Sequence, residues 1–270
     1  MAYRPTARTE AARAAQRERL LEAARGLLAE GGYAATGVVV VAERAGVATG
    51  SVYRHFASRQ ELLAAVFQHV AGHELDAVRE AVREAVRAQR GAAEQLRVLV
   101  EVFSHRALRA PRTAWALLAE PVDPLVQTER LAYRRGYLAL AREAIAEGVA
   151  TGELPPQEPS LSAAAVVGAI GEALLGPLSP VGALSPAEPP HPSAAPSPST
   201  AADQAATSPK TPRDPAAETL AVQALVALCL RAVGATAVAV TATAAAAIAA
   251  NAVEPHTPLR PTTTRDRTAP

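Results

Sequence analysis

TGVVVVAERAGVATGSVYRHFASR, residues 36–59 of this 270-residue chain, is the stretch that decides the fold. It predicts two short helices, at about 37–45 and 48–54, joined by a turn at Gly46. Glycine gives the backbone the freedom that a tight turn between two helices needs. Apolar side chains at helical spacing should lock the pair together: Val38, Val41, Ala42, Ala45, Val47, Val52 and Phe56. Two short helices joined in this way form a helix-turn-helix.

The segments on either side of this motif also read as helices. Leu20, Ala24, Leu27 and Leu28 recur at helical spacing and predict a helix over residues 10–30, which Gly31-Gly32 should end. We expect Thr36 to cap the first short helix and Ser58 to cap the long helix that follows the motif. Together these pieces predict one compact helical unit within the first 70 residues.

The second short helix is expected to present small polar residues, an aromatic ring and a guanidinium on its outer face. Its outward residues would be Thr49, Gly50, Ser51, Tyr53 and Arg54. Small residues allow a helix to enter the major groove of DNA. Tyr53 and His55 can donate to phosphates, and Arg59 lies at the start of the next helix, where backbone amides also favour phosphate.

The charge distribution and the helix packing bear on this interpretation. Residues 1–60 carry nine arginines against five glutamates, which indicates a polyanionic partner. Helical bundles that bind no DNA can share this geometry, and Tyr53 would then belong to the core. Because Val52 and Phe56 already take the inner face, we expect Tyr53 and Arg54 to project outward.

Several short pieces of this region resemble one family of regulators. They are Leu20-Leu21 with Ala23-Ala24, Gly32-Tyr33 with Ala35-Thr36, Ala42-Glu43-Arg44-Ala45-Gly46-Val47, and Gly50-Ser51-Val52-Tyr53 with His55-Phe56. Residues 17–70 therefore resemble the DNA-binding domain of the tetracycline-repressor (TetR/AcrR) family. The resemblance implies that Thr36 contacts phosphate, that Thr49, Gly50 and Ser51 face bases, and that Tyr53, His55 and Arg59 hold the DNA backbone.

The chain departs from the family pattern at three places, so the operator sequence cannot be taken from a relative. Thr49 stands where lysine is common, and Ala48 stands where a capping serine is common. Val39 and Val40 replace residues that are commonly charged, and these valines can instead pack on a neighbouring helix. The basic residues 1–16 are expected to form an arm, which either enters a minor groove or touches nothing specific.

The rest of the chain predicts an all-α protein, because alanine carries the apolar share and aromatics make up only 3% of the residues. We expect an amphipathic solvated helix over 77–88 and further helices at about 93–108, 112–119, 125–150, 160–176 and 216–234. The fold class is an N-terminal three-helix helix-turn-helix domain followed by a C-terminal helical bundle for ligand binding and dimerisation. The expected boundaries are a basic arm (1–16), the helix-turn-helix domain (17–60), the effector domain (61–176), a Pro-rich disordered linker (177–215), a dimerisation helix (216–234) and a low-complexity tail (235–270).

Residues 160–176 carry only one charged residue, Glu172, so this helix must be buried in a core or against another subunit. With residues 216–233 it would give a four-helix bundle in a homodimer, as the family resemblance also implies. The competing interpretation places helix 160–176 in the core of the monomer. Residues 232–253 carry no charge, and a membrane span, a helical extension and a disordered tail remain open for them.

A pocket for a small-molecule effector is expected among the helices of residues 93–150, where the resemblance also implies one. The candidate lining residues are Phe103, His105, Trp115, Leu118, Glu120, Tyr133, Arg134 and Tyr137. The alternative for each is an ordinary core or surface position. The ligand would be hydrophobic or mixed in character.

The sequence carries no enzyme signature. There is no G-x-x-x-x-G-K-[ST] loop, no G-x-G-x-x-G after a strand and no G-x-S-x-G. His69 and His73 have a spacing that can hold a metal, but solvent-facing histidines are the simpler interpretation. The single cysteine, Cys229, is expected to be a small buried residue rather than an intersubunit disulfide.

These observations predict a ligand-responsive transcriptional repressor that binds a palindromic double-stranded operator as a homodimer and is released by a small molecule. It would use no cofactor or metal, contact no membrane and work in the cytoplasm. The helix from Ser58 would couple the ligand to the DNA. The alternative is a small-molecule-binding helical protein without specific DNA recognition.

Overall fold

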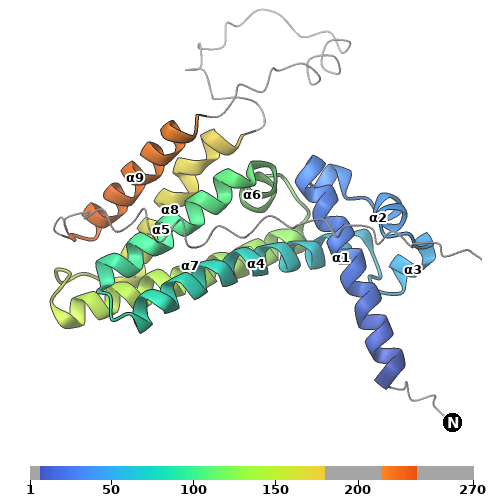
Figure 1. Ribbon diagram of the computed structural model, residues 1–270, viewed down its shortest axis with the longest axis horizontal. Coiled ribbons are helices and arrows are strands. Elements are labelled where there is room, and N and C mark those ends of the chain that lie inside the picture. The colour runs from blue at the N-terminus through green and yellow to red at the C-terminus, as the bar shows by residue number, and fades with distance from the viewer. Residues whose placement is uncertain (1–6, 180–213, 236–270) are drawn as a thin grey trace, which may run out of the picture. The chain divides into compact units, whose positions relative to one another are not determined.

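The computed structural model describes residues 7–179 and 214–235, which belong to one compact unit spanning Met1–Thr236 (Figure 1). These two segments form helices and contain no strand, which confirms the predicted all-α class. The elements are α1 (Ala7–Ala35), α2 (Val38–Arg44), α3 (Thr49–Tyr53), α4 (Arg59–Arg87), α5 (Ala92–Arg109), α6 (Pro111–Leu118), α7 (Pro124–Thr151), α8 (Pro159–Leu178) and α9 (Pro215–Ala232).

Helices α1, α2 and α3 and the first turns of α4 enclose the amino-terminal core. The largest side chains that they bury include Leu20, Leu28, Val41, Val52 and Phe67. Ser58 begins α4 as predicted, because its hydroxyl accepts from the Glu61 amide at 3.1 Å while the Glu61 carboxylate accepts from the Ala57 amide at 2.8 Å. The first bond is an N-cap bond, which satisfies one of the free amides at the start of α4, and the second satisfies the amide of Ala57, the residue before the N-cap.

One prediction for the first helix is wrong, at its amino-terminal end. Residues 7–16, assigned to an arm, are the first turns of α1, since an Ala-, Arg- and Glu-rich segment has high helix propensity. Gly32 has the non-helical values φ 71° and ψ −160°, so the first regular helix is interrupted at Gly31-Gly32 as predicted, and a further helical turn beyond this bend completes α1 at Ala35.

The cap of α2 also differs from the prediction. Gly37, not Thr36, is the N-cap residue, and no side chain caps this helix. The Thr36 hydroxyl is not free to do so, because it donates to the Gly32 carbonyl at 2.8 Å from a fully buried position. Residues 77–88, predicted as an amphipathic helix, form the outer end of α4.

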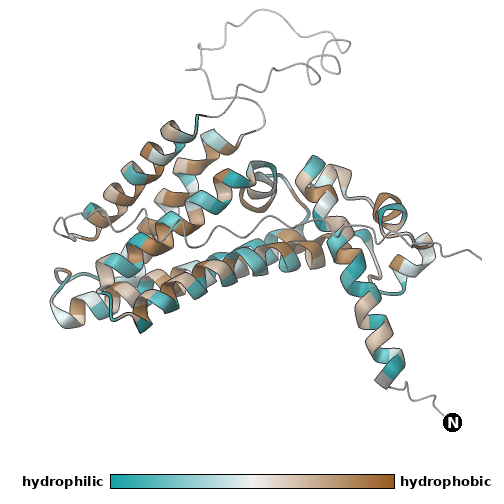
Figure 2. Cartoon of the chain, viewed as in Figure 1, coloured by the Kyte–Doolittle hydropathy of each residue, from teal (hydrophilic) through white to brown (hydrophobic). Residues whose placement is uncertain are grey.

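The carboxyl-terminal domain is a bundle in which α4 packs on α5 and α7, α7 packs on α8, and α5 packs on α9. Its helices start and stop where the sequence predicts, with a proline in the first turn of α6 to α9 and Gly152 in the left-handed conformation after α7. Figure 2 shows long brown stretches along α8 and α9.

Helices α8 and α9 are long and apolar enough to cross a membrane by length and composition. Core helices of water-soluble proteins pass the same test, and both helices contribute one face to the bundle core, for example through Ile170 and Val226. Each also exposes leucines, namely Leu161, Leu220 and Leu228. The predicted linker beyond residue 179 and the apolar segment beyond residue 235 lie outside the described residues.

Candidate nucleic-acid interface and ligand cavity

Helix α3 presents one apolar and one polar face, as the sequence predicts. Val52 and Phe56 are buried, whereas Tyr53 keeps 52% of its surface exposed and Gly50 and Arg54 are also exposed. Thr49 at the start of the helix is half-buried. A short helix is thus held from behind by its apolar residues and offers its amino-terminal half to a partner.

Cationic side chains from α1 gather beside this face. Arg13 donates to the Arg54 carbonyl at 3.4 Å, and Arg17 lies 5.3 Å from the centre of the Phe56 ring. Partial burial lowers the pKa of His55, and the nearby Arg13, Arg17 and Arg54 lower it further. The His55 ring lies 3.1 Å from the Gln16 side-chain oxygen. The three arginines, rather than the pKa shift that burial dominates, indicate the positive potential that a polyanion would meet here.

The structure does not place every predicted contact residue on this face. Thr36 is fully buried, so its side chain cannot reach a phosphate. Ser51 is only 7% exposed, and its hydroxyl accepts from Arg54 at 2.6 Å, so it orients Arg54 and is withdrawn from the surface. Arg59 is exposed and donates to the Tyr33 carbonyl at 3.4 Å.

Val39 and Val40 are exposed by 55% and 42%, so they do not pack on a neighbouring helix. They belong to α2, immediately before the buried Val41. Their exposure leaves two apolar side chains on the surface of α2.

A cavity of about 300 Å³ lies within the bundle, bounded by side chains from α4, α5, α6, α7 and α8. Its walls hold two aromatic pairs with edge-to-face geometry. Phe103 and Tyr137 have ring centres 5.1 Å apart, and Phe67 and Tyr133 have ring centres 5.6 Å apart. Concave, mainly apolar cavities with a few polar groups are typical of small-molecule sites.

Five of the eight predicted ligand residues line this cavity: Phe103, Leu118, Tyr133, Arg134 and Tyr137. His105, Trp115 and Glu120 do not, and these three predictions are wrong for this cavity. His105 is two residues from Phe103, which places it about 200° around the helix from the cavity wall. Trp115 packs instead against the bundle core.

The cavity adjoins the amino-terminal core directly. Phe67, Ala71 and Leu117 line the cavity and also belong to the buried cluster that holds α1, α2 and α3. A single layer of side chains therefore separates a bound molecule from the core of the helix-turn-helix domain.

A polar clamp joins α6 to the bend of α1. The Arg112 guanidinium donates to the Gly31 carbonyl at 2.8 Å and lies 3.0 Å from the Glu120 carboxylate. The same carboxylate accepts from the Tyr33 amide at 3.1 Å. A side chain on Gly32 would overlap both Arg112 and Glu120. These two side chains can therefore pack against the bend of α1 only because residue 32 is a glycine. We call this group of residues the α1–α6 clamp.

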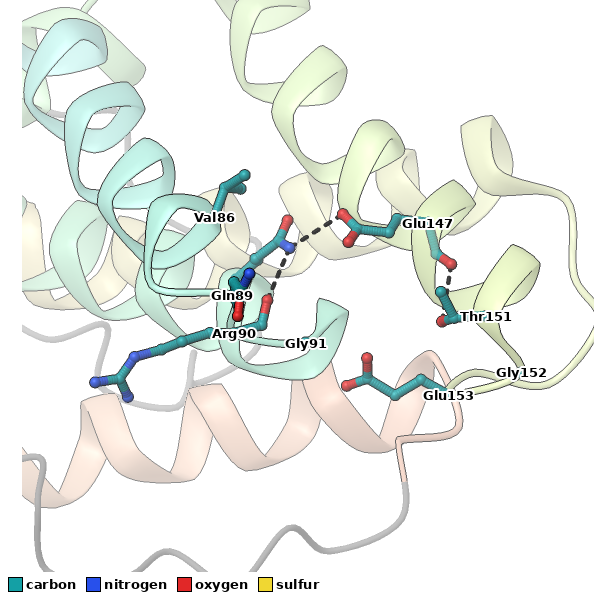
Figure 3. Close-up of a pocket in the computed structure, with 9 residues that line it drawn as sticks. Val86, Gln89, Arg90, Gly91, Glu147, Thr151, Gly152 and Glu153 are labelled. Carbon is teal, nitrogen blue, oxygen red and sulfur yellow. Dashed lines mark hydrogen bonds between the residues drawn. The ribbon is translucent and has the colours of Figure 1, made fainter.

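A second, open pocket of about 700 Å³ lies where α4 and α7 end and α5 begins, and Figure 3 shows its polar side chains. Glu153 accepts from the Ala92 and Ala93 amides at 2.7 and 2.9 Å, which caps α5. Gln95 donates to the Arg90 carbonyl and to Glu147, both at 3.1 Å. These polar groups are satisfied by one another, so the pocket is a set of helix caps.

Three further residues that could ligate a metal or react, His69, His73 and Cys229, have structural surroundings that explain them. His69 and His73 stack edge-on with ring centres 4.8 Å apart, and His69 is only 12% exposed beside Glu18, so it does not face solvent as predicted. No group of three or more potential metal ligands occurs within residues 7–179 and 214–235. Cys229 is buried, as predicted.

Comparison with known proteins shows which proteins the amino-terminal segment is similar to. Residues 20–66 match the model of bacterial regulatory proteins of the tetR family. This amino-terminal segment is similar to the DNA-binding segment of TetR-family regulators. The matched residues run from the middle of α1 to the first turns of α4 and include all of α2 and α3, so the TetR-family signature coincides with the surface described above.

Two TetR-family relatives are similar over part of their length. The transcriptional repressor KstR2 of Rhodococcus jostii is 32% identical over 129 residues, which are 48% of this chain and 61% of the relative. The transcriptional activator FasR of Mycolicibacterium smegmatis is 37% identical over 88 residues, which are 33% of this chain and 38% of the relative. The chain thus matches less than two thirds of either protein.

Solved structures of transcriptional regulators share the fold of this chain beyond the amino-terminal segment. The fatty acid degradation regulator FadR of Bacillus halodurans superposes with a TM-score of 0.55 at 20% identity, covering 79% of this chain and 97% of that chain. FadR of Bacillus subtilis in complex with stearoyl-CoA gives 0.51 at 22% identity, covering 58% and 84%.

Proposed function

We propose that the chain is a ligand-responsive transcriptional repressor that binds a palindromic operator as a homodimer and is released by a small molecule. The observation that carries this proposal is the exposed face of α3, with Tyr53 and Gly50 outward and Val52 sealed behind them. Of the two partial relatives, KstR2 is a repressor and FasR is an activator, so repression is the part of the proposal that a transcription assay with and without the protein tests. Since operator DNA lies in the cytoplasm of a bacterium, we place the protein there.

The geometry divides the DNA contacts into two kinds. Thr49 and Gly50 begin α3 and carry little bulk, so they can approach base edges in the major groove. Tyr53, Arg54 and Arg59 are exposed donors that can hold phosphates and fix the register of the helix. Binding should weaken steeply as salt rises, because phosphate contacts release counterions.

The homodimer rests on the exposed leucines of α8 and α9. Leu161 is 71% exposed and Leu220 is 65% exposed on helices that are otherwise apolar. We expect a second copy of the chain to cover these leucines. A palindromic operator requires two helix-turn-helix units about 34 Å apart, which a homodimer supplies. We expect wild-type protein to sediment as a dimer and Leu220→Glu to sediment as a monomer.

The coupling between ligand and DNA follows from the shared wall and the α1–α6 clamp. The cavity is lined by Leu117, whose helix α6 also places Arg112 on the bend of α1. A ligand that shifts α6 would move α1 as well as α4, so the predicted link through α4 gains a second path. If the ligand favours a spacing of the two α3 helices that does not fit the operator, DNA affinity falls, and DNA lowers ligand affinity equally.

A gel-shift assay tests the proposal. Full-length protein is mixed with duplexes from upstream of its own and neighbouring genes, at several salt concentrations and with excess competitor DNA. We expect a specific complex that Tyr53→Ala weakens on every duplex, whereas Thr49→Ala changes which duplex is preferred. Val86→Ala is the matched control, since Val86 is 50% exposed at the distant end of α4. Ligand binding without any specific complex would instead support a helical ligand-binding protein.

A further inference from the structure

The charged side chains that line the bundle cavity differ in whether they are free to bind a ligand. One carboxylate and three guanidinium groups line it: Glu74, Arg106, Arg130 and Arg134. Arg106 donates to both oxygens of Glu74, at 2.6 and 3.1 Å, so these two charges satisfy each other. The single negative charge in the lining is therefore already paired and offers nothing to a cationic ligand.

Arg130 is also committed. Its guanidinium donates to the carbonyls of Leu117, Ala116 and Glu120 at 2.8, 3.1 and 2.8 Å. These bonds satisfy carbonyls at the carboxyl-terminal end of α6, so Arg130 fixes the wall of the cavity. Withdrawing it toward a ligand would leave part-buried carbonyls without a donor.

Arg134 is the remaining cation of the lining, and it has no hydrogen bond or ion pair within the described parts of the chain. It is exposed on α7, and its Nη2 lies 3.9 Å from the position that a Cβ on Gly168 of α8 would take. The guanidinium thus extends from α7 to α8 at the mouth of the cavity, beside the lining residues Val167 and Gly171. The small size of Gly168 leaves room for it.

We infer that the cavity takes an amphipathic carboxylate, with its apolar body between the aromatic pairs and its carboxylate on Arg134. A planar guanidinium matches a carboxylate through two parallel hydrogen bonds. The cavity volume of about 300 Å³ is at the small end of ligand pockets, so the body of the ligand should be compact. This inference depends on the proposed function only in taking the cavity as the ligand site.

Two dyes with one skeleton test the inference. 8-Anilinonaphthalene-1-sulfonate carries a negative charge, and N-phenyl-1-naphthylamine lacks it. With full-length protein, we expect Arg134→Ala to weaken binding of the anionic dye about tenfold and to leave the neutral dye within about twofold. Decanoate should displace the anionic dye at a lower concentration than decanol does, and this preference should vanish in Arg134→Ala.

Two further variants make the outcome decisive. Arg135→Ala removes the neighbouring exposed arginine, which does not line the cavity, and should change nothing. Gly171→Phe fills the cavity from α8 and should abolish binding of both dyes, while the Cβ itself meets no neighbour within 4 Å, so the helix is preserved.

An unchanged affinity of Arg134→Ala for the anionic dye, or equal competition by decanoate and decanol, would overturn the inference and leave the ligand site standing. Unchanged binding of both dyes to Gly171→Phe would overturn the inference and also remove the ligand site from the proposed function.

Discussion

Replacing Gly32 with alanine should destabilise the protein by about 3–5 kcal/mol. Gly32 has φ 71° and ψ −160°, a conformation that costs other residues about 1–3 kcal/mol. The new Cβ would also displace the Arg112 and Glu120 side chains. Losing the bonds from Arg112 to the Gly31 carbonyl and from Tyr33 to Glu120 removes two charge-assisted hydrogen bonds, at about 1.5 kcal/mol or less each in this part-buried site.

Thermal unfolding followed by far-ultraviolet circular dichroism measures the effect. A loss of this size lowers the Tm by about 10 °C in a protein of this length. Gly152→Ala is the control, because Gly152 also has a positive φ of 77° but its Cβ would meet nothing within 4 Å. It should lose only about 1 kcal/mol. Equal destabilisation by the two variants would refute the clamp, as would full additivity of Gly32→Ala with Arg112→Ala.

Three further predictions follow from the structure. Glu153→Ala should destabilise the protein by about 1 kcal/mol in urea unfolding, because it uncaps α5, and an equal stability of Glu153→Ala and wild type would contradict this. Cys229 should stay unlabelled by a thiol reagent at pH 8 until the protein unfolds, because burial raises the pKa of its thiol to about 11; rapid labelling of folded protein would be the opposite result. The folded-state pKa of His55 lies below the ordinary value of 6.5, so its contribution to stability is present above pH 6.5 and declines as pH falls toward that lowered pKa; the pH profile of unfolding should be flatter for His55→Gln, and identical profiles would exclude this role.

The sequence predicts helix boundaries well wherever a local signal marks them. Ser58 has its capping partner three residues on, and Gly152 follows α7, so each boundary depends on neighbours in the chain. The outward position of Tyr53 follows from the burial of Val52 on the same short helix and of Phe56 just after it. Local periodicity is sufficient in these cases because the packing partner of each helix face lies close in sequence.

Contacts between distant segments could not be predicted in this way. Arg112 and Gly31 are 81 residues apart, and only the folded arrangement of α6 against α1 brings them together. The same contact draws Glu120 away from the cavity and into the clamp. Thr36 was misplaced for a related reason, since the bend at Gly32 offers its hydroxyl a carbonyl that the sequence does not reveal.

Selection of duplexes from a random DNA pool by full-length protein tests the central claim most directly. The account predicts enrichment of one inverted repeat whose half-sites lie about 34 Å apart, and no enrichment with Tyr53→Ala. Enrichment of no sequence by wild-type protein, or of the same repeat with equal affinity by Tyr53→Ala, would contradict the assignment of α3 as the DNA-reading helix.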